Sequence, residues 1–183
     1  LSVIHQMSKR FQAMTTPILM LILLTAPYTI ANMLNRVIGR TFDVRNGAVL
    51  GLGILFIFTG IGHFIQTLPM AQMLPPWVPW RVPLVYATGI LEFAIALGLF
   101  FPRCRRLAGT VAIIVLVLFF PANIYAAFNH IPMGGHEWGP TYLFIRAPLQ
   151  AIIILWAYWF TVRKDSRVLE KPHNQAVSLC DSA

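Results

Sequence analysis

Long apolar runs separated by short polar segments dominate the chain. Four runs reach or approach the roughly 20 residues that a helix needs to cross a bilayer. They lie at 47–66, 84–101, 108–128 and 142–162. A fifth run, 17–34, is shorter and is broken by Pro27. The pattern predicts an all-α protein, a transmembrane four-helix bundle with an additional N-terminal hydrophobic segment.

The composition agrees with a membrane protein. Of the 183 residues, 57% are apolar and only 11% are charged, and the mean hydropathy is +0.69. These values lie outside the range of soluble domains. We expect three regions: an N-terminal extension with its hydrophobic segment at 1–46, the bundle at 47–163, and a polar cytoplasmic tail at 164–183.

The basic residues indicate the orientation. The net charge is +8, but Lys and Arg gather in the segments 35–46, 102–107 and 163–183, whereas the alternate connections 67–83 and 129–141 contain only Arg81. Because cytoplasmic loops are rich in Lys and Arg, the first group is predicted to be cytoplasmic, together with the C-terminus. The charge pattern is thus a topology signal, and no nucleic-acid partner is expected.

The N-terminal run allows two interpretations. Lys9 and Arg10 precede the apolar "PILMLILL", as in a signal peptide, but no small-residue cleavage site follows. If 17–34 spans the membrane, Lys9 and Arg10 lie outside, against the charge rule; if it lies in the interface, they stay inside. Its length favours a span.

Two further features bear on the class of protein. Cys104 and Cys180 both fall on the predicted cytoplasmic side and form no CxxC pair, which argues against thiol-exchange chemistry. The outer connection 67–83 contains five prolines with Trp77 and Trp80. Proline predicts that it forms no regular helix, and the tryptophans favour the headgroup level.

Polar residues inside the predicted spans are few, and they define a candidate ligand-binding site: His63, Glu92, Asn123, Arg146 and Gln150. At about 1.5 Å rise per residue, they lie roughly 5 to 12 Å from the outer helix ends. Neighbouring helices alternate in direction, so random placement would scatter them over both leaflets. We therefore expect them to meet inside the outer half of the bundle.

Arg146 is the expected partner of Glu92. An unpaired ion in hydrocarbon costs roughly 2.5–3.5 kcal/mol, and a guanidinium can hold a carboxylate and still serve another acceptor. His63 would then exchange a proton with Glu92 or with a ligand. Two interpretations stay open: a ligand or proton site, or a structural pair that fixes helix register. Asn123 is also typical of helix packing.

A metal site is not expected. The outer loop holds His130, His136 and Glu137, but these residues lack a regular ligand spacing. No catalytic residue can be assigned from the sequence.

Six motifs occur in one order along the chain. They are "GxxHF" (60–64), "LPPWVP" (74–79), "TGILEF" (88–93), "GLFFPRCRRLAG" (98–109), "FPANIYAA" (120–127) and "RAPLQ" (146–150). Together they resemble the DoxX-like family of small bacterial integral membrane proteins, over about residues 47–163. The resemblance implies a four-helix bundle in the bacterial inner (plasma) membrane.

The resemblance also implies a function. Members are linked to membrane subunits of redox complexes, which makes a quinone the expected cofactor and an oxidoreductase subunit or a further copy of the chain the expected partner, besides the lipid bilayer. No haem, flavin or iron–sulfur ligation pattern is visible, so electron transfer would depend on a quinone or a partner, and a stand-alone enzyme is not expected. The alternative is a non-enzymatic membrane scaffold or assembly factor. A permease would need polar residues in the inner half, where almost none occur.

Overall fold

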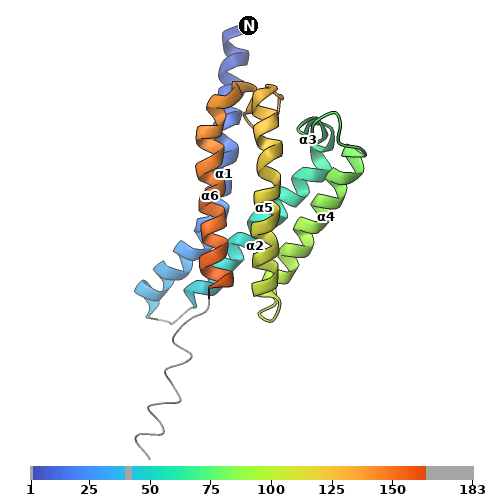
Figure 1. Ribbon diagram of the computed structural model, residues 1–183. Helices are drawn as coiled ribbons and strands as arrows, with labels where there is room; N and C mark the ends of the chain where they lie inside the picture. The colour runs from blue at the N-terminus through green and yellow to red at the C-terminus, as the bar shows by residue number, and fades with distance from the viewer. Residues whose placement is uncertain (1, 40–42, 164–183) are drawn as a thin grey trace, which may run out of the picture.

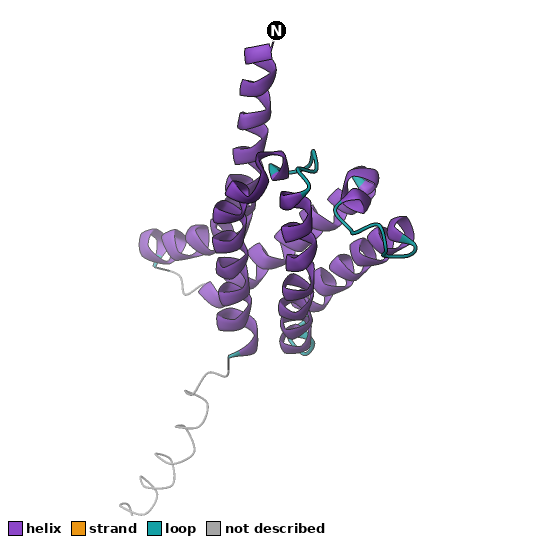
Figure 2. Ribbon diagram, turned by 45° about the horizontal axis from the view of Figure 1, so that its top comes forward, coloured by secondary structure: helices purple, strands orange, loops and turns teal. Residues whose placement is uncertain are grey.

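The computed structural model describes residues 2–39 and 43–163, with side chains from Met14 onward, and every regular element in these ranges is helical (Figure 2). In chain order the elements are α1 (Ser2–Ile38), α2 (Val44–Ile65), α3 (Thr67–Gln72), α4 (Arg81–Phe100), α5 (Arg105–Phe128), the 3₁₀ helix η1 (His136–Tyr142), α6 (Leu143–Ala157) and the π-helix η2 (Tyr158–Val162). The all-α prediction is confirmed. The predicted tail, with Cys180, lies outside the described residues.

Five helical segments are long and apolar enough to cross a membrane. They are Met14–Ile38, Val44–Ile65, Arg81–Phe100, Arg105–Phe128 and His136–Val162. The last four correspond to the predicted bundle helices, and the first contains the predicted N-terminal segment. The chain is therefore consistent with a multi-pass membrane protein.

The prediction that Pro27 breaks the N-terminal run is wrong. α1 continues through both Pro17 and Pro27, as apolar helices can when neighbouring helices pack against them. Its partner is α2: a Cβ on Gly51 would overlap the Leu24 carbonyl oxygen, and one on Gly47 would lie 2.9 Å from the Pro27 oxygen. The two glycines thus let the backbones of α1 and α2 touch.

The helices form one bundle around α2. In Figure 1, the axes of α5, α6 and the upper part of α1 are roughly parallel, with α5 antiparallel to the other two, while α2 crosses them diagonally and α4 lies along its far side. α2 packs chiefly against α4 and α1. The apolar core includes Leu52 and Phe56 of α2, Leu99 of α4, Ala112 of α5 and Ile153 of α6. α2 therefore joins the N-terminal helix to the rest of the bundle.

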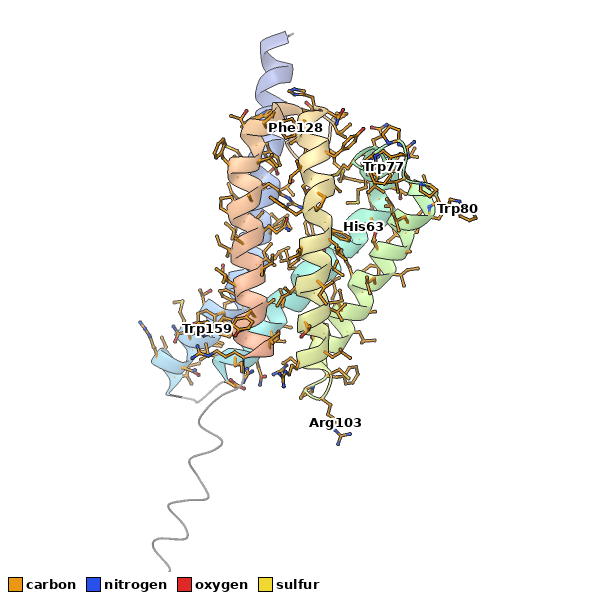
Figure 3. The ribbon with its side chains drawn as sticks, viewed as in Figure 1. His63, Trp77, Trp80, Arg103, Phe128 and Trp159 are labelled. Atoms are coloured by element: carbon orange, nitrogen blue, oxygen red, sulfur yellow. The ribbon has the colours of Figure 1, made fainter. Side chains whose placement is uncertain are left out.

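The connection between α2 and α4 differs from its prediction. It begins with a short helix, α3, although prolines argued against one. Pro69 lies in the first turn of α3, where a missing N–H removes no helical hydrogen bond. Beyond α3, Trp77 and Trp80 are each 80% exposed, and Figure 3 places both at one end of the bundle, opposite Arg103. Figure 1 shows the N-terminal end of α1 at the same end as α3.

The other end of the bundle is joined by long-range hydrogen bonds. Arg45 Nε donates to the carbonyl of Phe160 at 2.9 Å, and Trp156 Nε1 donates to that of Ala48 at 3.1 Å. At the same end, Arg105 Nη1 donates to Asn46 Oδ1 at 2.9 Å. These contacts tie the start of α2 to α5 and to the last turns of the chain's final helix.

Candidate functional site

The predicted site residues come from four helices, α2, α4, α5 and α6. His63, Asn123 and Arg146 each lie within about two turns of the helix end that faces Trp77 (Figure 3). Glu92 is different, because α4 begins at Arg81 and Glu92 therefore lies near the middle of the helix. The expectation that all five occupy the outer half of a membrane stays a prediction.

His63 and Glu92 form an ion pair between α2 and α4. His63 Nε2 lies 3.6 Å from Glu92 Oε1. Glu92 is 4% exposed and His63 is partly buried, so the pair lies largely away from solvent. α4 can approach α2 here because a Cβ on Gly89 would lie 2.8 Å from the Cβ of His63.

The hydrogen bond made by Nδ1 of His63 determines whether Nε2 can donate or accept. Nδ1 lies 3.0 Å from the carbonyl of Val85, and a carbonyl can only accept, so Nδ1 carries a hydrogen. Thr88 Oγ1 donates to the same carbonyl at 2.8 Å and lies 3.1 Å from Nδ1. In neutral His63, Nε2 then presents a lone pair to Glu92. With this tautomer, the contact with Glu92 becomes a hydrogen bond only when a proton lies on Nε2 or on the carboxyl.

The direct ion pair predicted between Glu92 and Arg146 does not form. No N···O contact within 4.0 Å joins the two side chains, and Glu92 acts on Arg146 only at longer range. The hydrogen bond that Arg146 makes in the structure runs from Nη1 to Met20 Sδ of α1 at 3.6 Å. The carboxylate faces His63 because α4 packs on α2 much more closely than on α6.

His136 and Tyr142 extend the site beyond the predicted residues. His136 is 3% exposed and Tyr142 is 1% exposed, and their rings pack edge to face at 4.9 Å. Both lie near enough to Arg146 for electrostatic interaction. The sequence placed His136 in a polar loop, so its burial was missed. The feature of the sequence that came closest to indicating this part of the site was Tyr142, which lies four residues before Arg146 and on the same helical face.

The backbone before η1 positions this histidine. Gly135 has φ of +101°, and a Cβ there would overlap the ring of Tyr142. His136 Nδ1 donates to the carbonyl of Met133 at 2.7 Å, so Nε2 of neutral His136 is an acceptor. His136 therefore presents an acceptor nitrogen inside the protein.

Asn123 and Gln150 form hydrogen bonds with main-chain carbonyls. Asn123 Nδ2 donates to Phe119 within α5 at 3.0 Å. Gln150 Nε2 donates to Leu116 and thereby links α6 to α5. The bond of Gln150 gives its amide a helix-packing role, whereas the bond of Asn123 stays within its own helix.

Three buried side-chain atoms of the described residues have no hydrogen-bond partner: Glu92 Oε2, His136 Nε2 and Arg146 Nε. Leaving such an atom unsatisfied costs about 1–3 kcal/mol. Glu92 Oε2 and His136 Nε2 can accept hydrogen bonds, and Arg146 Nε can donate one. Together these three atoms can bind a polar group. We call the four residues His63, Glu92, His136 and Arg146 the buried polar cluster, although His63 and Arg146 as whole residues are only partly buried.

The described residues do not fit a metal site. No group of three His, Cys, Asp or Glu side chains within 2–39 and 43–163 could hold a metal ion.

Comparison with known proteins places most of the bundle in one family. No curated protein and no solved structure matches the chain. Residues 52–161 match the family described as Domain of unknown function (DUF8561). The match includes every residue of the buried polar cluster, while α1, with Met20, lies before it. Since the match covers more than half of its length, the chain belongs to the DUF8561 family.

Proposed function

We propose that the protein resides in the bacterial inner membrane, with its C-terminus in the cytoplasm, and holds the polar head of a small amphipathic ligand in the buried polar cluster. One observation carries the proposal: Glu92 Oε2, His136 Nε2 and Arg146 Nε are buried and lack partners. Protein interiors rarely leave such atoms unsatisfied, and a bound polar group would satisfy them.

A quinone is the ligand class that we propose first. The resemblance to the DoxX-like family points to a membrane subunit of a redox-linked complex, in which an oxidoreductase partner would supply the electrons. Arg146 Nε can donate to a carbonyl oxygen, and the His63–Glu92 pair, which interacts with Arg146 at longer range, can take up or release a proton. A quinone, when bound, would supply the two-electron, two-proton chemistry of its ring. The chain's own part is to bind the ring and to move protons.

Quenching of tryptophan fluorescence by a short-chain ubiquinone tests this function. The wild-type protein in neutral detergent should bind the quinone, and Arg146→Met should weaken binding about 10- to 100-fold, the loss of a charged hydrogen bond. Arg103→Met is the matched control, since Arg103 is exposed at the opposite end of the bundle (Figure 3), and it should bind normally. Equal affinities of the wild type and Arg146→Met would contradict a quinone site here.

The alternative function is a scaffold whose polar residues specify helix packing. The bond from Gln150 of α6 to the main-chain carbonyl of Leu116 in α5 favours it. A scaffold predicts that Glu92→Gln combined with Arg146→Met folds and keeps the protein's cellular activity. Loss of activity in a folded double variant would favour the ligand site.

A further inference from the structure

Arg146 is a cation with poor partners. Its guanidinium offers five N–H donors, but the structure gives it one hydrogen bond, to the sulfur of Met20 at 3.6 Å. A thioether is a weak acceptor. Nε is buried and has no partner. Arg146 therefore lies in the bundle without an acceptor suited to its charge.

No carboxylate of the described residues neutralises Arg146 by contact. None lies within 4.0 Å of the guanidinium. Glu92 acts on Arg146 at longer range, but its carboxyl faces His63. Asp43 caps α2 at the opposite end of the bundle, where Oδ1 accepts from the backbone N–H of Arg45 at 3.0 Å. Arg146 therefore has no carboxylate in direct contact among the described residues, and Glu92 acts on its charge only from a longer distance.

An oxyanion is the group that best completes this arrangement. Hydrogen bonds between a guanidinium and an oxyanion are roughly twice as strong as neutral ones, and two can form side by side. A neutral carbonyl would satisfy Nε but would leave the charge. Met20, 5% exposed on α1, lies where such a group would bind.

We infer that Arg146 binds an oxyanion, a carboxylate or phosphate group of the ligand, in place of the Met20 thioether. The inference rests on the ligand site proposed above but does not depend on a quinone. It also gives α1 a role: the helix that precedes the family match supplies the side chain that covers Arg146 in the absence of ligand.

A carboxylate built into the protein tests this without knowledge of the ligand. Glu and Met have similar length and helix propensity, so Met20→Glu should place an anion beside Arg146 and raise Tm by about 2–4 °C in neutral detergent. Met20→Gln, the uncharged control, should not raise it. In an Arg146→Met background, Met20→Glu should lower Tm. Equal effects of Met20→Glu in both backgrounds would overturn the inference.

Added anions give a second test and separate the sources of the group. Inorganic phosphate, octanoate and dihexanoyl phosphatidylglycerol are titrated against the wild type in maltoside micelles, with dihexanoyl phosphatidylcholine as the zwitterionic control. Stabilisation by phosphate alone indicates that the site binds a free anion. Stabilisation by octanoate indicates an amphiphilic acid, and stabilisation by phosphatidylglycerol indicates a lipid headgroup. Each supports the inference only if Arg146→Met and Met20→Glu abolish the effect.

The outcomes separate this inference from the proposed quinone function. If none of the three anions stabilises the wild type, Arg146 is not an oxyanion site and the inference fails, whatever the quinone does. If the wild type binds an anion but no quinone, the oxyanion site stands and the quinone is excluded. If the quinone binds and the anions do not, the quinone function stands alone.

Discussion

At the scale of single residues, His63 shows how one hydrogen bond determines which ring nitrogen carries the hydrogen. The carbonyl of Val85 fixes the hydrogen of Nδ1, so the interaction with Glu92 requires a proton between Nε2 and the carboxyl. The sequence identified both residues, because polar side chains are rare in apolar helices. It could not identify them as partners, since that depends on how closely α2 and α4 pack.

The shared proton predicts a strongly non-additive pair of substitutions. His63→Leu leaves the Glu92 carboxyl buried without its partner and should cost about 3–5 kcal/mol of unfolding free energy. Glu92→Gln should cost far less, because the Gln amide can donate to Nε2. The double variant His63→Leu with Glu92→Met should recover much of the loss. Thermal unfolding in detergent measures these variants together with Glu92→Met alone, which closes the cycle; additive effects of His63→Leu and Glu92→Met would mean that the residues do not interact.

At the scale of helices, the apolar runs predicted the four bundle helices closely, since length and hydropathy alone define a span. The errors came from prolines. Pro27 was expected to interrupt its run and Pro69 to prevent a helix, yet α1 and α3 contain them. Whether a proline ends a helix depends on its place in the turn and on neighbouring helices, which a single segment does not reveal.

The glycine contact between α1 and α2 predicts a position-specific effect. Gly51→Ala puts a methyl group into the space of the Leu24 carbonyl, so α1 must move away, at a cost of about 1–3 kcal/mol. Gly62→Ala on the same helix is the matched control, because its nearest neighbour is the flexible end of Met70 at 3.4 Å. Gly51→Ala should lower Tm and Gly62→Ala should not; similar Tm values would show that α1 is not held closely at Gly51.

At the scale of the whole molecule, five helices of spanning length would place the two ends of the chain on opposite sides of a membrane. The basic residues favour a cytoplasmic C-terminus, and α1 then places Lys9 and Arg10 outside. The charge rule and the helix count thus disagree at the N-terminus. Hydropathy could not resolve the disagreement at the N-terminus, because it predicts the length of α1 but not the contacts of α1 with α2 and α6.

Cysteine labelling in spheroplasts tests the orientation. Cys104 is exposed at the connection between α4 and α5 and serves as a native reporter for the predicted cytoplasmic side once Cys180→Ser is introduced. Trp77→Cys, made in a background without other cysteines, reports on the opposite end, where Trp77 is 80% exposed. A membrane-impermeant maleimide should label Trp77→Cys in intact spheroplasts and Cys104 only after lysis. The reverse pattern would place the oxyanion site of Arg146 on the cytoplasmic side, so that its ligand would come from the inner leaflet or the cytoplasm.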